Sequence, residues 1–430
     1  MKVSILGSGY VGTTIAASFA AFGHDVINVD IDEDVVTTIN AGEAPIHEPG
    51  LDELLDKHGG DRLTATTEYT DILETDLTFL ALPTPSKSDG SIDTSIIETA
   101  AEQLGQTLAN KPGDHTVVTK STVIPTTTTE ILAPLVADAS GKTIGEDLHI
   151  AMNPEFLREG TAVEDFQHPD KLVFGANDSV ALDSLYDVFD PLLQSGDIPV
   201  IETGVKEAEM IKYANNAFLA SKISLINDLG NICKEFDIDA YEIADAIGLD
   251  DRISERFLRS GVGWGGSCFP KDVNAIIAAA REQGYEPPLL AAAVEVNDLQ
   301  PERMLELLER HVDPAGKRIA VLGLAFKPGT DDVRNSRAIE AIEGLLDRDA
   351  KVVAYDPVAT ENMRAHFPDI EYVGSAAEAL SHADGTLVMT DWDEFGALDV
   401  EFEDMAQPVV IDGRRVIETR EGITYEGLTW

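Results

Sequence analysis

Short apolar runs alternate with segments of helical periodicity over the first 200 residues. The runs KVSILG, VINVD, DLTFLAL, HTVVTKS, DLHIAMN, KLVFGA and IPVIET have the length and composition of buried strands. The segments between them repeat apolar residues every three to four positions, as amphipathic helices do. Alternating strands and helices indicate βαβ units and a mostly parallel sheet. We therefore predict one α/β domain over residues 1–203.

The strand pattern is absent from about Gly204 to Arg310. One long helix is predicted from Val205 to Glu235, with Glu207 and Glu209 in its early turns. Its apolar positions are Met210, Ile211, Ala214, Phe218, Ile223, Ile226 and Leu229. Further helices follow, and we expect Pro287, Pro288 and Pro301 to separate them, since proline interrupts helices. Residues 204–312 are thus predicted to form a central helical domain.

A second α/β pattern covers residues 313–430. It starts at KRIAVLGLAF, continues through KVVAYDP and GTLVMT, and is expected to end at PVVIDGR near the C-terminus. Its first turn has one glycine, Gly323, and no full G-x-G-x-x-G. The predicted fold class is therefore α/β, with two Rossmann-like doubly wound domains joined by a helical domain with one long helix.

Composition narrows the class of protein and its partners. A chain of 430 residues exceeds the roughly 250–300 residues at which single cores stop growing, so several domains are expected. The chain has 31 Lys and Arg against 78 Asp and Glu, a net charge of −47. Nucleic acid and anionic membranes are therefore poor partners. We interpret the acidity as adaptation to a salt-rich cytoplasm, and expect a cytoplasmic protein because no signal-peptide pattern precedes the first strand.

A dinucleotide-binding fingerprint follows the first strand. Gly7, Gly9 and Gly12 form G-x-G-x-x-G, the turn that lets a pyrophosphate rest on a helix N-terminus. Asp30 ends the next strand, where a carboxylate binds the adenosine ribose hydroxyls and repels a 2′-phosphate. The pattern favours NAD over NADP, and this segment alone leaves FAD open.

Cys268 is the main candidate for covalent chemistry. It lies in GVGWGGSCFPKD, among glycines and next to Lys271 and Asp272, which is the setting of a thiolate nucleophile. The alternative is a buried structural cysteine. The only other cysteine is Cys233, and the two have neither disulfide nor metal-ligand spacing. We expect reduced thiols and no metal.

A lysine and an asparagine share one face of the long predicted helix. Lys212 and Asn216 are four residues apart, so together they can hold an oxyanion or position a water molecule. The alternative is a solvated polar stripe.

Further candidates follow strand ends, where open α/β sheets bind ligands. Glu155 and Glu159 lie in NPEFLREG, Thr122 in KSTV and Thr84 in LPTP. The two glutamates can orient water or bind sugar hydroxyls, or they can simply favour a helix start.

Basic residues are few, and two groups of them stand out. The first is Arg252, Arg256, Arg259 and Lys271, and the second is Lys327, Arg334 and Arg337. Both groups are candidates for phosphate binding, and solvated surface pairing is the alternative.

Taken together, these motifs resemble the UDP-glucose/GDP-mannose dehydrogenase family. The matching segments occur in family order: GSGYVG, NAGEAPIHEPGL, LPTP, STV, NPEFLREG, EAEMIKYANNAFLASKIS, RISERFL, GVGWGGSCFPKD and FKPGTDDVRNSRAIE. The resemblance implies an enzyme that oxidises the C6 alcohol of a nucleotide sugar to a carboxylate with two NAD per turnover. It also implies a homodimer built on the central helix.

The resemblance assigns catalytic roles residue by residue. Cys268 matches the nucleophile that captures the C6 aldehyde as a thiohemiacetal, which is then oxidised to a thioester. Lys212 and Asn216 match the pair that stabilises oxyanions and positions water. Asp272 matches the carboxylate that works with Lys212 in acid/base catalysis. Glu155, Glu159 and Thr122 complete the implied catalytic set.

Ligand contacts are implied in the same way. The residues that match cofactor contacts are Gly7, Gly9, Tyr10, Val11, Gly12, Asp30, Thr84, Thr122, Glu159, Lys271 and Arg334. Those that match nucleotide-sugar contacts are Glu155, Phe156, Leu157, Arg158, Glu159, Lys212, Asn216, Phe257, Leu258, Gly261, Gly265, Lys327 and, from the neighbouring subunit, Arg252.

One departure and several alternatives stay open. Many family members have a lysine shortly after the ribose-binding aspartate, where this chain has Val35, so weaker NAD binding is expected. Ser267 precedes the cysteine, as in the branch that acts on UDP-glucose, whereas the branch for N-acetylated UDP-sugars tends to have histidine there. GDP-mannose remains a candidate. A two-electron β-hydroxyacid dehydrogenase and a sugar-nucleotide sensor that has lost catalysis are the rival classes.

Overall fold

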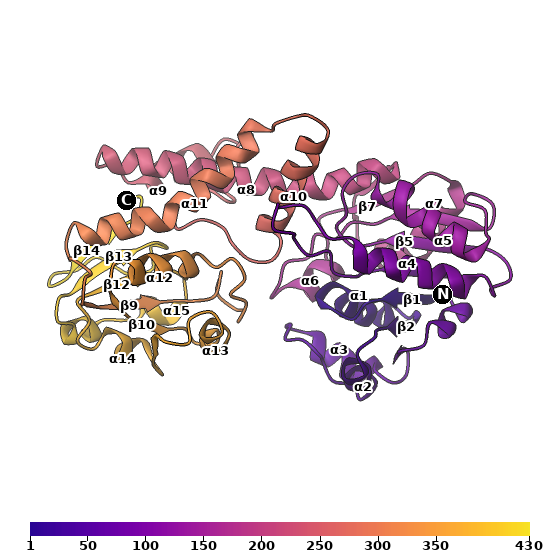
Figure 1. Cartoon of the computed structure of the whole chain (residues 1–430), viewed down its shortest axis with the longest axis horizontal. Coiled ribbons are helices and arrows are strands. Elements are labelled where there is room, and N and C mark those ends of the chain that lie inside the picture. The colour runs from indigo at the N-terminus through magenta and orange to yellow at the C-terminus, as the bar shows by residue number, and fades with distance from the viewer. The chain divides into compact units, whose positions relative to one another are not determined.

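The computed structural model describes residues 1–430, which form two compact units, Met1–Asn215 and Asn216–Trp430. Each unit contains one Rossmann-like sheet, and the long helix α8 (Val205–Glu235) begins in the first unit and ends in the second (Figure 1). The predicted fold class is confirmed. The predicted boundaries at residues 203/204 and 312/313 stay a prediction. No helix is long and apolar enough to cross a membrane.

The first unit is built on eight strands in the order β3-β2-β1-β4-β5-β6-β7-β8. All neighbours are parallel except β6 and β7. The strands are β1 (Lys2–Leu6), β2 (Asp25–Val29), β3 (Leu63–Thr66), β4 (Leu77–Leu80), β5 (His115–Thr119), β6 (Leu148–Met152), β7 (Leu172–Ala176) and β8 (Val200–Thr203). Its helices are α1 (Tyr10–Ala21), α2 (Glu33–Asn40), α3 (Leu51–His58), α4 (Ser95–Leu108), α5 (Ala133–Ser140), α6 (Ala162–Gln167) and α7 (Ser179–Ser195).

Two apolar layers cover the two faces of this sheet. On one face Phe19 of α1 packs against Phe79 of β4 and Phe189 of α7, with ring centroids 5.3 Å apart in both pairs. On the other face Leu104 of α4 packs in a cluster with Leu132. Since both faces are buried, the strands read as continuous apolar runs, which is why the sequence revealed seven of them.

The second unit has six parallel strands in the order β11-β10-β9-β12-β13-β14. The strands are β9 (Arg318–Leu322), β10 (Lys351–Tyr355), β11 (Glu371–Tyr372), β12 (Gly385–Val388), β13 (Val409–Asp412) and β14 (Thr424–Gly427). Besides the end of α8, its helices are α9 (Ala240–Gly248), α10 (Phe269–Glu282), α11 (Pro288–Glu309), α12 (Arg337–Asp347), α13 (Thr360–Arg364), α14 (Ala376–Leu380) and α15 (Asp393–Gly396).

Two expectations for this unit were wrong. The sheet does not end at PVVIDGR, because β14 pairs with β13 in parallel beyond it. Pro301 does not separate helices but lies buried inside α11, where it lacks only one backbone donor. Pro287 and Pro288 do mark a boundary, since Pro287 caps α11 and Pro288 is its first residue.

Candidate active site

The glycine fingerprint of the first unit forms a tight turn between β1 and α1. Gly7 has a φ of +100°, which favours glycine, and a Cβ on Gly12 would lie 2.0 Å from the Gly7 carbonyl oxygen. A Cβ on Gly9 would meet nothing within 4 Å. The backbone at Gly9 is therefore open to a ligand, at the start of α1, where the helix N-terminus favours a pyrophosphate.

Asp30 lies at the carboxyl end of β2, beside this turn. Its carboxylate accepts from the Ser8 amide at 2.6 Å and from the Asp32 amide at 3.1 Å. These two bonds fix the acid where an adenosine ribose is expected. Val35, in place of the family lysine, packs against the apolar layer, so it offers no charge to the cofactor. The turn and Asp30 fit NAD.

Thr84 and Thr122, predicted from different segments, are neighbours. The hydroxyl of Thr84 donates to the Thr122 carbonyl oxygen at 2.8 Å, and Thr84 is buried. The structure therefore brings the LPTP and STV segments together at the carboxyl ends of β4 and β5.

Glu155 and Lys212 form a buried ion pair in the first unit. Lys212 Nζ lies 2.5 Å from Glu155 Oε1, and the second carboxylate oxygen accepts from the Leu157 amide at 2.7 Å. Burial favours the neutral acid, but the charge and hydrogen bond of Lys212 outweigh it, so the pKa of Glu155 lies below its ordinary value. The pair holds the NPEF segment against α8.

A second buried amine lies beside this pair. Lys120 Nζ donates to Asn153 Oδ1 at 2.7 Å and to the Pro154 carbonyl oxygen at 3.5 Å. Burial is the main cause that lowers the pKa of Lys120 to about 7, while Glu155 opposes the shift and Lys212 adds to it. Lys120 therefore supports the turn that carries Glu155.

In the second unit, Cys268 is the N-cap residue of α10. The thiol is half-buried, and Ser267 Oγ lies 3.6 Å from Sγ. The amides and dipole of a helix N-terminus stabilise negative charge, which is the form a thiol needs for nucleophilic attack.

Asp272, one turn into α10, contacts two other predicted residues. It is 1% exposed and accepts from Asn216 Nδ2 at 2.7 Å and from Lys271 Nζ at 2.6 Å. The carboxylate therefore orients the Asn216 amide. The predicted acid/base partnership of Asp272 with Lys212 stays a prediction.

The glycine loop before Cys268 is fixed by the 334–335 segment. The Gly266 amide donates to the Arg334 carbonyl oxygen at 2.9 Å, and Asn335 Nδ2 donates back to the Gly266 carbonyl oxygen at 3.1 Å. A Cβ on Gly265 would lie 2.2 Å from the Asn335 carbonyl oxygen. This close approach explains the glycine.

Several predicted ligand residues use their side chains for internal contacts. Arg252 is strongly exposed and pairs with Asp250, whereas Leu258 is buried in an apolar cluster. Arg158 pairs with Asp165, and Tyr10 bonds Glu48. The predicted ligand contacts of these residues stay a prediction.

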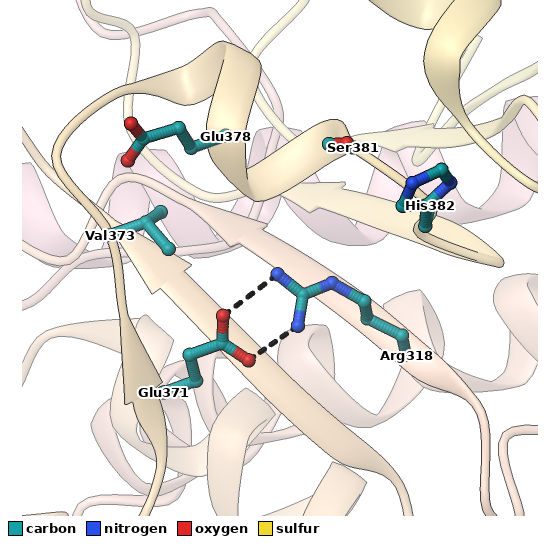
Figure 2. A pocket seen from close by; sticks show the side chains of 6 residues that line it. All are labelled: Arg318, Glu371, Val373, Glu378, Ser381 and His382. Atoms are coloured by element: carbon teal, nitrogen blue, oxygen red, sulfur yellow. Dashed lines mark hydrogen bonds and ion pairs between the residues drawn. The ribbon is translucent and has the colours of Figure 1, made fainter.

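The second sheet borders two surface pockets. Figure 2 shows one, of about 460 Å³, at the amino ends of β9 and β11, where Arg318 is held by both oxygens of Glu371. The other, of about 610 Å³, lies at the carboxyl ends, between Pro357 and the 391–394 segment. Open α/β sheets bind ligands at the carboxyl ends, so the second pocket has the position of a ligand crevice.

The chain belongs to the UDP-glucose/GDP-mannose dehydrogenase family. Residues 1–193 match its NAD binding domain, residues 206–299 its central domain and residues 320–419 its UDP binding domain. The chain is 65% identical to the UDP-glucose 6-dehydrogenase AglM of Haloferax volcanii over 429 residues, with 100% of each chain covered.

Solved structures show the same architecture. A UDP-glucose dehydrogenase from the hyperthermophilic archaeon Pyrobaculum islandicum has a TM-score of 0.93 and 41% identity, covering 100% of this chain and 98% of that one. A UDP-D-ManNAc dehydrogenase from Pyrococcus horikoshii has a TM-score of 0.88 and 27% identity, and the match covers 100% of this chain and 99% of that one.

The structure adds two residues that the sequence did not single out. Lys120 is visible in the sequence only as a lysine after a strand, and Glu48 only as one acid among many. Their positions depend on contacts with residues 33 to 114 positions away. No local pattern signals such contacts.

Proposed function

We propose that this chain is an NAD-dependent dehydrogenase that oxidises the C6 alcohol of UDP-glucose to the carboxylate of UDP-glucuronate. The observation that carries the proposal is Cys268 at the N-terminus of α10, in the unit that also contains the Asn216–Asp272 pair. The full-length 65% identity to the Haloferax volcanii UDP-glucose 6-dehydrogenase supports the choice of substrate.

Two NAD molecules, bound one after the other by the glycine turn and Asp30, would each accept one of the two hydrides. Lys212, Asn216 and Asp272 act on the alcohol oxygen. The Asp272 carboxylate takes its proton, and the Lys212 ammonium and Asn216 amide stabilise negative charge on it. The Cys268 thiolate then adds to the aldehyde carbon and forms a C–S bond. This step is needed because the remaining hydrogen on that carbon can leave as hydride only after a nucleophile has added and made the carbon tetrahedral.

Loss of the second hydride from the thiohemiacetal leaves a thioester on Cys268. A water molecule, positioned by Asn216 and Glu159 in this proposal, attacks the thioester carbon. The C–S bond breaks, the sulfur keeps the electron pair, and the carboxylate leaves. Thr122 lies with Thr84 on the cofactor side, and Lys327 and the backbone of Phe257 to Gly261 bind the nucleotide sugar.

The number of NADH formed per sugar tests this reaction. The wild type is expected to give two NADH per UDP-glucose, and Cys268→Ser to form no net acid while still binding NAD. Cys233→Ser is the matched control, because it removes the other thiol, on α8. This variant should still form two NADH per UDP-glucose. One NADH per sugar from the wild type would instead indicate a two-electron dehydrogenase. Two NADH per sugar from Cys268→Ser would refute the role of Cys268 as nucleophile.

Substrate choice within the family needs its own measurement. UDP-glucose, UDP-galactose, UDP-N-acetylglucosamine, UDP-N-acetylmannosamine and GDP-mannose would be compared by initial rate at high salt. We expect the highest kcat/KM for UDP-glucose. A higher value for GDP-mannose or an N-acetylated sugar would move the chain to another branch of the family.

We also propose a homodimer built on α8 in a salt-rich cytoplasm. Five apolar residues of α8 are exposed at helical intervals: Met210, Phe218, Leu225, Leu229 and Ile232. A second copy would cover this stripe and bring Arg252 to the neighbouring site. Leu225→Glu should give a monomer by light scattering and raise KM for UDP-glucose, whereas Leu289→Glu, at an exposed residue of α11, should leave the dimer intact.

A further inference from the structure

Glu48 is a buried carboxylate at a junction of three segments of the first unit. It is 2% exposed and lies between α2 and α3. Its oxygens accept from the Tyr10 hydroxyl, from the Gly160 amide at 2.8 Å and from the Ala162 amide at 2.6 Å. Burying a carboxylate is costly unless donors satisfy it, so these donors fix the position of Glu48.

Tyr10 joins this junction to the cofactor turn. It is the first residue of α1, directly after Gly9, so its backbone lies where a dinucleotide pyrophosphate is expected. Its hydroxyl donates to Glu48 and accepts from the Gly160 amide at 2.9 Å. Burial, and then the hydrogen bond to Glu48, raise the pKa of Tyr10, so the phenol remains a donor.

Gly160 and Ala162 join the junction to the 155–160 loop, which bears Glu155 and Glu159. Gly160 directly follows Glu159 and has a φ of +83°. Ala162 begins α6, whose N-cap residue Thr161 makes no side-chain capping bond. The Glu48 carboxylate instead accepts a hydrogen bond from the Ala162 amide. The 155–160 loop is therefore held at one end by the Glu155–Lys212 pair and at the other by Glu48.

We propose that Glu48 is a positioning residue that couples the cofactor turn to the loop bearing Glu155 and Glu159. Through Tyr10 and Gly160, a shift of the α1 N-terminus when the dinucleotide binds moves the loop that faces the sugar. The two ligands then bind with linked affinities, and each changes the affinity of the other by the same factor. The inference rests on the proposed function, since it takes UDP-glucose as the second ligand.

NADH titrations followed by fluorescence test the coupling, with and without saturating UDP-glucose, because NADH cannot oxidise the sugar. The wild type is expected to show an NADH Kd that changes at least about fivefold when UDP-glucose is added. Glu48→Gln keeps the shape of the side chain but removes its charge, and should bring this ratio close to one. Tyr10→Phe should do the same, and the double variant should lose no more than the larger single effect.

Glu53→Gln, at an exposed residue of α3, is the matched control and should keep the wild-type ratio. An unchanged ratio in both Glu48→Gln and Tyr10→Phe would overturn the proposal, as would a ratio of one in the wild type. If Glu48→Gln fails to fold, Tyr10→Phe decides. Wild-type formation of two NADH per UDP-glucose would leave the proposed function standing in each of these cases, whereas absence of UDP-glucose binding would overturn both.

Discussion

Lys212 and Glu155 form an ion pair with almost no access to solvent. Their side chains are 3% and 8% exposed, and Nζ and Oε1 are 2.5 Å apart. The Glu155 carboxylate offsets the cost of burying the Lys212 ammonium. The same pair ties the NPEF segment to α8, so it serves both structure and the proposed chemistry.

Removing one partner of this pair should cost far more than removing a surface charge. Glu155→Gln leaves a buried ammonium without its counter-charge, and the free energy of unfolding should fall by about 3–5 kcal/mol. Denaturant unfolding followed by circular dichroism measures the loss. Glu53→Gln removes an exposed carboxylate and should change stability by less than about 0.5 kcal/mol. Equal losses in the two variants would contradict this interpretation of the pair.

The glycines of the first turn should respond differently to the same added methyl group. Gly12→Ala places a Cβ 2.0 Å from the Gly7 carbonyl oxygen, so the turn must shift and both stability and NAD affinity should fall. Gly9→Ala meets no protein atom within 4 Å, so it should fold normally and lose NAD affinity alone, by tenfold or more, because the backbone there must approach the pyrophosphate. Thermal melts measure the effect on stability, and NADH titrations measure the effect on cofactor affinity. An NAD affinity equal to that of the wild type in Gly9→Ala would mean that the pyrophosphate binds elsewhere.

Most of the fold could be predicted because burial leaves a strong local pattern. The long helix is observed with the predicted ends, Val205 and Glu235, and the strands with a continuous apolar run were predicted in both sheets. The strands β3, β11 and β14 were missed because their sequences, LTAT, EY and TYEG, contain at most two apolar residues each and so form no apolar run.

The candidate site was predictable as a set of residues but not as a set of partners. Glu209 illustrates the limit: in the sequence it is one acid in the first turns of a helix. In the structure it is buried and accepts from the Thr126 and Thr128 amides at 2.6 Å and 2.8 Å, so it holds the segment that follows Thr122. Such long-range pairings depend on how the strands are ordered, which periodicity does not encode.

Lys120 should make stability depend on pH. In the folded chain its pKa is about 7, against an ordinary value of 10.5, because burial disfavours the ammonium. Between these two values the unfolded chain binds more protons, so this residue makes the folded state more stable as pH rises from about 7 to 10. Below about 7 the amine is charged in both states and its penalty is fully present.

Lys120→Met removes this titration. Unfolding free energies of the wild type and of Lys120→Met would be measured at several values between pH 6.5 and 10, and their difference should shift in favour of the wild type as pH rises. Lys57→Met, at an exposed lysine of α3, controls for loss of a charge and should give a difference independent of pH. A constant difference for Lys120→Met as well would mean that Lys120 keeps an ordinary pKa when folded.

Salt should stabilise this chain because its charges repel one another. At a net charge of −47 the folded state concentrates carboxylates that the unfolded chain spreads apart. The screening length falls from about 10 Å at 0.1 M to about 3 Å at 1 M, so repulsion between neighbouring surface acids is largely removed. We expect the Tm to rise steeply between about 0.1 and 1 M KCl and more slowly above, since little repulsion then remains to be screened.

Sucrose stabilises by exclusion from the surface without screening, so it should not reproduce the steep rise. A triple variant of α3, Asp52→Asn with Glu53→Gln and Asp56→Asn, removes three exposed charges and should melt higher than the wild type at low salt and converge with it at high salt. A Tm that does not change with KCl would refute the interpretation of the acidity as adaptation to a salt-rich cytoplasm.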